Sequence, residues 1–168
     1  AQSFTVDETG AFLTSFDVFF KSKDDNAKLF VELRYVELGT PTKYLVQDYA
    51  QIAVNPNNIN ISDDASVATT LNFPSPIYLE PEKEYALVFL SPASDKYEMW
   101  VATMGERTVS STTLPDVQNV VVSKQYIGGS LFKSQNGTIW TASQYQDLTF
   151  KLRKASFVES GTASFYNS

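Results

Sequence analysis

Two adjacent pairs of aspartates are the first candidates for chemistry. Asp24-Asp25 and Asp63-Asp64 both stand in short polar stretches between apolar segments, and Asp favours turns. Carboxylate oxygens are also the hard ligands that Ca²⁺ prefers. The sequence lacks the Asp-x-Asn-x-Asp-Gly spacing of a dedicated calcium loop. We therefore interpret both pairs mainly as solvated turns, and the alternative is a Ca²⁺ site that uses Asp24, Asp25, Asp63 and Asp64.

Catalytic carboxylates are a second possibility. A glycosidase needs two carboxyl groups about 5 to 9.5 Å apart across a cleft, and no spacing marks a pair such as Glu80 with Glu98. The sequence contains no His and no Cys, which excludes Ser–His–Asp and Cys–His nucleophiles and cysteine-bound metals. We expect a protein that is not an enzyme, with no catalytic residues and no cofactor.

Aromatic side chains suggest a binding function more strongly. Asn136-Gly137 predicts a type I′ turn that pairs residues 131–134 with 138–141, and Trp140 would then lie near the hairpin tip. Exposed aromatic rings there could stack on the apolar faces of sugars. The alternative is that Trp140 anchors its hairpin and that Trp100 is a core residue. The speculative glycan site comprises Trp140, Tyr126, Tyr145, Gln135 and Asn136.

Charge and hydropathy exclude other partners. The formal net charge is −6, and the densest basic stretch, residues 151–154, alternates with Leu152 like the solvent face of a strand. A nucleic-acid interface normally needs a basic patch, so we expect no nucleic-acid partner. We also expect no membrane span, because no run of about 18 apolar residues occurs.

The elements that must position these residues are strands. Apolar residues recur with a period of two, which is typical of strands with one face in a core. Tyr85 to Leu90 and Met99 to Ala102 are apolar on both faces and predict central strands buried on both sides, or strands paired under a covering loop. Turn signals separate these segments at short intervals. The pattern predicts an all-β, antiparallel, jelly-roll-like β-sandwich, with alternating segments at residues 12–20, 29–35, 67–73 and 148–152.

Two segments give weaker predictions. Residues 44–54 fit a short helix and a strand equally well. Residues 103–125 are rich in Ser and Thr and predict a long loop, the kind of region that carries variable function. We expect residues 1–168 to form a single domain that was excised from a longer chain.

Several stretches of the chain are distinctive. The most distinctive is Gly-Gly-Ser-Leu-Phe-Lys-Ser-Gln-Asn-Gly-Thr-Ile-Trp-Thr at residues 128–141, followed by Gln144 and residues 147–152; the others are residues 1–8, 10–20, 76–81 and 84–88. Together they resemble a virion protein of T4-like tailed bacteriophages that infect marine cyanobacteria. The resemblance implies a structural module of a tail or baseplate, assembled in the bacterial cytoplasm and located in the virion. It implies contacts with other virion proteins, homo-oligomers among them, and no catalytic motif.

The first half is also similar to β-sandwich modules that bind carbohydrate or occur on cell surfaces. The matching residues are Gln2, Phe4, Val6, Thr14, Ser15, Asp17, Val18 and residues 85–88. Because fold alone does not fix function, this likeness supports only an alternative: a carbohydrate-binding module that contacts host-surface glycans.

Overall fold

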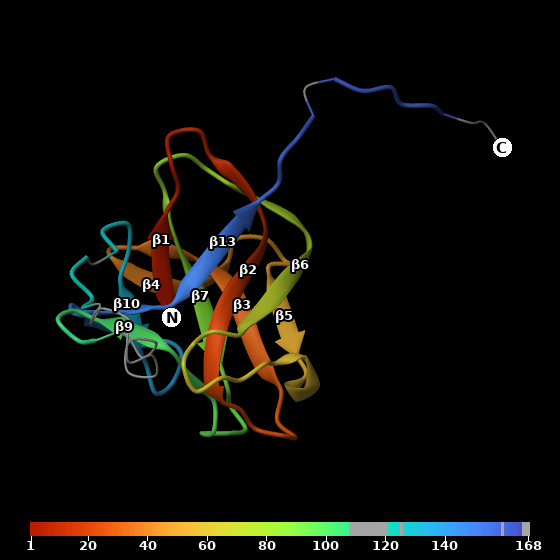
Figure 1. Ribbon diagram of the computed structural model, residues 1–168. Coiled ribbons are helices and arrows are strands. Elements are labelled where there is room, and N and C mark those ends of the chain that lie inside the picture. Colours follow the sequence, from red (N-terminus) through yellow and green to blue (C-terminus); the bar gives the residue numbers. More distant parts are fainter. Residues whose placement is uncertain (108–120, 125, 159, 166–168) are drawn as a thin grey trace, which may run out of the picture.

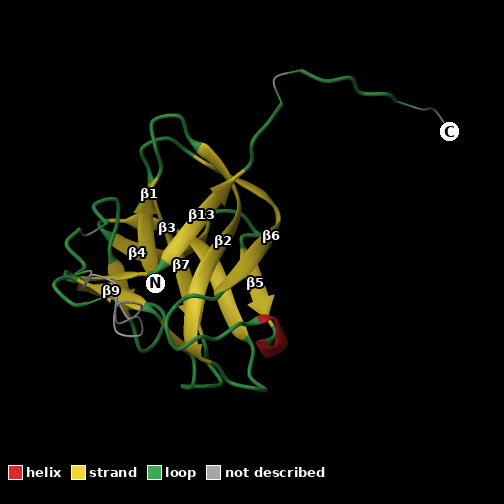
Figure 2. Cartoon of the chain, in the orientation of Figure 1, coloured by secondary structure: helices red, strands yellow, loops and turns green. Residues whose placement is uncertain are grey.

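The computed structural model describes residues 1–107, 121–124, 126–158 and 160–165, and in them the chain folds almost entirely into strands (Figure 2). Every pair of strands in this part of the chain is antiparallel. The sheets curl against each other around one core, which confirms the predicted all-β sandwich class. Within these described ranges, the one short helical element is the 3₁₀ turn η1 (Pro56–Asn58).

The larger sheet has seven strands, in the order β11-β10-β1-β7-β3-β4, with β5 paired to β3. Strands distant in sequence therefore lie side by side in it (Figure 1). Its members are β1 (Gln2–Thr5), β3 (Leu29–Glu37), β4 (Thr40–Leu45), β5 (Gln51–Val54), β7 (Glu84–Leu90), β10 (Leu131–Lys133) and β11 (Thr141–Ser143).

The second sheet is built on two long strands, β2 (Ala11–Ser22) and β6 (Ala68–Leu79). The strand β13 (Phe150–Lys154) pairs with the other side of β2, and β8 (Glu98–Met99) pairs with the end of β2. A separate two-stranded sheet joins β9 (Val101–Thr103) to β12 (Gln146–Leu148).

The core lies between the two main sheets and is formed by the alternating apolar residues. Phe16, Val18 and Phe20 of β2 are fully buried, as are Val31 and Leu33 of β3. The central strand β7 is buried on both faces over Tyr85 to Val88, as its apolar composition predicts. Residues from strands far apart in sequence thus share one core.

The predicted face of Phe12 is wrong. A register shift in the pairing of β2 with β6, between Leu13 and Ser15, interrupts the period of two. On the early side of this β-bulge it is Leu13 that enters the core, with 2 % exposure, and Phe12 turns outward with 39 %. A bulge inserts one residue and so exchanges the two faces of a strand.

The second predicted central strand, Met99 to Ala102, is also wrong. It is split between β8, which pairs with β2, and β9, which pairs with β12. Trp100 stands between them: its N–H donates to Phe19 O (2.9 Å) and its carbonyl accepts from Thr149 N (3.1 Å). Because the segment lies at the edge of the second sheet, Trp100 is half-buried rather than a core residue.

Residues 44–54 follow the extended alternative. Strand β4 ends at Leu45 and β5 begins at Gln51, and both pair with β3. Val46 N donates to Leu33 O and Leu33 N to Ala50 O, so β3 supplies the partners that a helix would have provided internally. The predicted loop at 103–125 lies largely outside the described residues, since 108–120 and 125 are not among them.

The hairpin around Asn136-Gly137 forms, with a register that differs from the prediction. Lys133 pairs with Thr141 and Leu131 with Ser143, so the connecting loop is wider than a two-residue turn. Gly137 has a φ of +70°, but Asn136 is outside the left-handed region that a type I′ turn requires. Asn136 Oδ1 instead accepts from the N–H groups of Thr138 (3.0 Å) and Ile139 (2.9 Å), which stabilises the wider loop.

Candidate functional site

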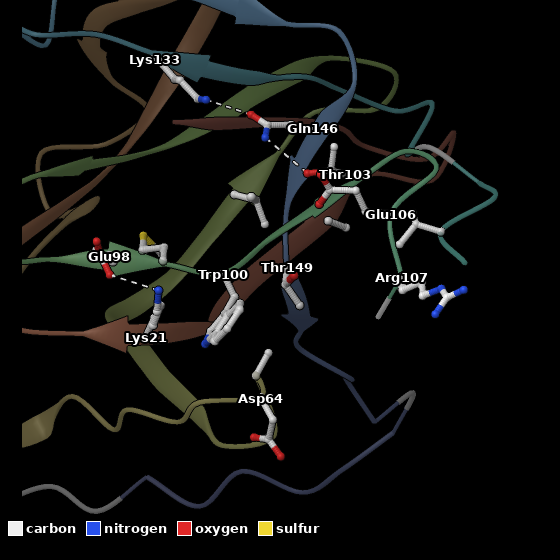
Figure 3. A pocket seen from close by; sticks show the side chains of 15 residues that line it. Lys21, Asp64, Glu98, Trp100, Thr103, Glu106, Arg107, Lys133, Gln146 and Thr149 are labelled. Carbon is white, nitrogen blue, oxygen red and sulfur yellow. Dashed lines mark hydrogen bonds and ion pairs between the residues drawn. The ribbon is translucent and has the colours of Figure 1, made fainter. Parts of the chain in front are cut away.

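An open groove of about 840 Å³ lies along β8 and β9 at the edge of the second sheet (Figure 3). We call it the Trp100 groove, after the tryptophan that lines it. Strand β2 contributes Lys21, the loop before β6 contributes Asp64, and β12 contributes Gln146. The groove is therefore assembled from segments that the sequence separates widely.

Neighbouring residues fix the position of the Trp100 indole. Its Nε1–H donates to Ser62 O at 2.9 Å. The ammonium of Lys21 lies 6.0 Å from the ring centroid and 3.9 Å from a carboxylate oxygen of Glu98. Figure 3 shows Lys21 and Glu98 on one side of the ring and Thr149 on the other. The ring orientation is thus fixed before any ligand arrives.

A second side of the groove consists of a short hydrogen-bonded chain. Lys133 Nζ donates to Gln146 Oε1 (2.8 Å), and Gln146 Nε2 donates to Thr103 Oγ1 (3.3 Å). Figure 3 shows Glu106 beside Thr103, with Arg107 farther out.

The carboxylate of Asp64 is prepared to accept hydrogen bonds. Its Oδ1 accepts from Ser66 N at 3.0 Å, and the hydroxyl and backbone of Ser66 hold the pKa of Asp64 below its usual range. Asp64 is therefore ionised at neutral pH. This is the protonation state of an acceptor and not that of a general acid.

The structure brings together only two of the three aromatic residues of the predicted glycan site. Tyr126 and Tyr145 line a neighbouring groove of about 480 Å³, the Tyr145 groove. Tyr145 is 68 % exposed, whereas Tyr126 packs edge-on against Phe150 with ring centroids 5.6 Å apart. Burial raises the pKa of the Tyr126 phenol. Tyr126 thus serves partly as packing.

The other predicted glycan residues lie elsewhere. Gln135 and Asn136 line a small depression at the hairpin loop together with Ile139. Trp140 is half-buried at the end of that loop and lines neither groove among those described here. Its Nε1 is buried without a hydrogen-bond partner in the described part of the chain. This placement agrees with Trp140 as an anchor of its hairpin.

Asp24 closes a turn. Its Oδ1 accepts from the N–H groups of Asn26 (2.7 Å) and Ala27 (2.8 Å), and its Oδ2 accepts from Ser94 Oγ (2.9 Å) and pairs with Lys96 at 3.6 Å. The Ala27 and Asn26 amides, then the Ser94 hydroxyl, hold the pKa of Asp24 far below its usual range. These protein donors already occupy the oxygens that a Ca²⁺ ion would need.

The other predicted metal ligands do not complete a site with Asp24. Asp25 and Asp63 are exposed, and Asp64 lies in the Trp100 groove. Within the described residues no group of three or more His, Cys, Asp or Glu side chains could hold a metal ion. The arrangement favours the interpretation of both aspartate pairs as turns.

Sequence reasoning missed an aromatic cluster on the outer face of β2 and β6. The ring centroid of Phe12 lies 5.0 Å from that of Tyr78 and 5.1 Å from that of Phe157. The three side chains are 39 %, 47 % and 67 % exposed, respectively. The bulge that turns Phe12 outward has no marker in the sequence, so the period of two assigns this residue to the core.

In comparisons with known proteins, no family model, no curated protein and no solved structure matches the chain. Among the described residues, no helix has the length and apolar character needed to cross a membrane.

Proposed function

We propose that this chain is a structural module of a tailed-phage virion, in the tail or baseplate, that works through contacts with neighbouring virion proteins. Two features support the proposal. One is the resemblance of residues 128–141 and the flanking segments to such virion proteins. The other, which carries most weight, is the exposed aromatic cluster of Phe12, Tyr78 and Phe157.

The aromatic cluster continues into the C-terminal segment. Ala155 N donates to Phe12 O at 2.8 Å, which fixes the start of this segment beside β2. Beyond it the chain leaves the sandwich (Figure 1), and Val158 and Phe165 are 86 % and 92 % exposed. Exposed apolar side chains that gather on one surface, as Phe12, Tyr78 and Phe157 do, are typical of interaction sites.

The geometry of the cluster suits a protein partner. The ring of Phe12 is inclined by 46° to Tyr78 and by 81° to Phe157. Rings at such angles form a raised knob that can fill a pocket, as buried aromatic residues do at interface hot spots. They do not form the flat surface on which a sugar chain would lie.

The charged edge strand beside the cluster opposes contacts at the sheet edge and leaves the cluster as the apolar contact surface. Strand β13 carries Lys151, Arg153 and Lys154, all exposed, at one edge of the second sheet. Charged residues on an edge oppose uncontrolled strand pairing. An acidic chain with a guarded edge stays soluble before assembly and presents a defined apolar contact.

The test is the composition of phage particles. In a phage that encodes the chain, mass spectrometry of purified virions should find the polypeptide in fixed proportion to the other tail proteins. Particles of the Phe12→Ser/Tyr78→Ser variant should lack it, while the isolated variant should remain folded and lose roughly 2–3 kcal/mol of unfolding free energy, since the two side chains are 39 % and 47 % exposed.

Tyr44→Ser is the matched control, because Tyr44 is an exposed tyrosine of β4, outside the cluster. It should leave incorporation unchanged. Wild-type virions that consistently lack the polypeptide would refute the virion assignment. Full incorporation of the double variant would refute the contact surface.

A further inference from the structure

We propose that the Trp100 groove binds a neutral oligosaccharide. This inference goes beyond the assembly function and uses a different surface from the aromatic cluster. It also places the glycan site at residues other than Trp140, Tyr126 and Tyr145.

The first argument is the aromatic ring. Sugar rings present apolar C–H faces that pack on an aromatic face. Trp100 borders the groove, and the Ser62 carbonyl fixes its indole through the 2.9 Å bond from Nε1. A ring that is already oriented loses little side-chain entropy on binding. This is an advantage that the freely exposed Tyr145 lacks.

The second argument is the charge of the lining. Three carboxylates are balanced by three cationic side chains, in the set Asp64, Glu98, Glu106, Lys21, Arg107 and Lys133. A polyanion would meet the carboxylates and a polycation the ammonium and guanidinium groups. The groove therefore selects against both kinds of charged ligand.

The third argument is hydrogen-bond complementarity. Carboxylates only accept hydrogen bonds, and Lys and Arg only donate them, whereas a hydroxyl does both. A ligand with many hydroxyl groups can satisfy both kinds of side chain at once. Gln146, which is already oriented by Lys133 and Thr103, adds an amide with both functions. These features together describe a neutral polyol with an apolar face.

The dimensions agree with this class. About 840 Å³ falls in the usual range for ligand sites, and the groove is open to solvent, so an oligosaccharide can enter it. A closed pocket would restrict binding to a single small molecule.

The experiment is an NMR titration of the whole chain. The sequence has two tryptophans, so the ¹⁵N spectrum contains two indole N–H signals, and Trp140→Phe assigns them. Maltotetraose, cellotetraose and mannotetraose are added separately to about 10 mM, which covers millimolar Kd values. A heparin tetrasaccharide and a chitosan tetramer are the anionic and cationic probes. At least one neutral probe should shift the Trp100 indole and the Gln146 side-chain amide.

Two variants test the residues. Trp100→Ala and, in case that variant does not fold, Gln146→Ala should each weaken binding about tenfold or more, as expected for residues central to a contact. Trp140→Phe and Tyr44→Ala should bind as the wild type does. No response to any neutral probe, binding of charged probes only, or shifts centred on Trp140 or Tyr145 would each overturn the proposal. None of these outcomes bears on incorporation into virions.

Discussion

Asp17 is a buried charge whose environment explains why it is tolerated. It lies on β2 with 3 % exposure, and both carboxylate oxygens pair with the guanidinium of Arg153 on β13. Thr70 of β6 donates its hydroxyl to Oδ1 as well, at 2.6 Å. One side chain thus joins three neighbouring strands on the outer face of the second sheet. The bond from Arg153 holds the pKa of Asp17 below its usual range.

We expect Asp17→Asn to lower the free energy of unfolding at pH 7 by about 2 kcal/mol, because it replaces charge-assisted hydrogen bonds with neutral ones. Urea denaturation followed by tryptophan fluorescence measures the change. Asp25→Asn, in an exposed turn, is the matched control and should have almost no effect. Equal effects of the two substitutions would contradict the role assigned to Arg153.

Gln2 is a buried neutral side chain that, like Asp17, is tolerated because it forms hydrogen bonds with another strand. It is fully buried on β1, its Nε2 donates to Asp147 Oδ1 (3.1 Å), and its Oε1 accepts from Leu148 N (2.7 Å). These bonds attach β12, and with it one side of the Trp100 groove, to the larger sheet. The period of two places Gln2 on the same face as the buried residues Phe4 and Val6. Its partners Asp147 and Leu148 lie at the other end of the sequence, so its hydrogen bonds could not be predicted.

Gln2→Leu should cost about 3 kcal/mol of unfolding free energy, because it leaves two buried polar groups without a partner. The amides of β12 should also exchange hydrogen faster, which NMR can follow residue by residue. Gln135→Leu, on the exposed hairpin loop, serves as the comparison. Unchanged protection of β12 would mean that Gln2 does not hold this strand.

At the scale of elements, the approach of β1 to the segment before β10 depends on a glycine. A Cβ on Gly129 would lie 2.0 Å from Ser3 O and 2.4 Å from Ser3 C. These are backbone atoms held by the bonds between Ser3 and Ser130, from Ser3 N to Ser130 O and from Ser130 N to Ser3 Oγ, both 2.9 Å. Neither β1 nor the segment before β10 can move away without breaking these hydrogen bonds.

Gly129→Ala should therefore destabilise the protein by about 2–3 kcal/mol, the usual cost of overpacking, and should lower the thermal midpoint in a calorimeter. Gly161→Ala is the matched control, since nothing lies within 4 Å of the added methyl group. A Gly129→Ala protein that melts with the wild type would show that β1 and the following segment can separate freely.

The elements also show what could be predicted from the sequence. Alternation over β3, β6 and β13 was sufficient to predict strands, and the apolar run of β7 predicted its central place, because local hydrophobic pattern determines which face is buried. The bulge in β2 and the wide hairpin loop depend on partners distant in sequence. The Trp100 groove could not be predicted for the same reason: Lys21, Asp64 and Gln146 meet only after the sheets have formed.

For the whole molecule, the carboxylates determine how stability depends on acid. Asp7, Asp17, Asp24 and Asp64 all have pKa values below the usual range because hydrogen-bond donors stabilise their charged forms. A group with a depressed folded pKa contributes stability above its unfolded pKa and loses it as the pH falls through the folded pKa. The unfolding free energy should therefore decrease below about pH 4, the unfolded pKa of Asp.

The tyrosines determine how stability depends on pH in alkaline solution. Burial raises the pKa of Tyr85, Tyr97 and Tyr126. A phenol with a raised folded pKa contributes stability below its unfolded pKa and loses it as the pH rises through the folded value. The stability of the wild type should thus decrease again above about pH 10.

Net charge also contributes to the dependence of stability on acid. The chain carries −6 at pH 7 and has a pI of about 4.6, so protonation of carboxylates reduces the overall repulsion only down to that pH. At lower pH the net charge is positive, and repulsion then destabilises the fold together with the loss of the hydrogen bonds. Urea denaturation from pH 2 to pH 7 in about 1 M salt, where the Debye length is about 3 Å, removes most of the repulsion and should preserve the acid loss. Asp17→Asn should make that loss shallower, whereas a stability that no longer falls below about pH 4 in this salt would show that the acid loss comes from the net charge and not from these donors.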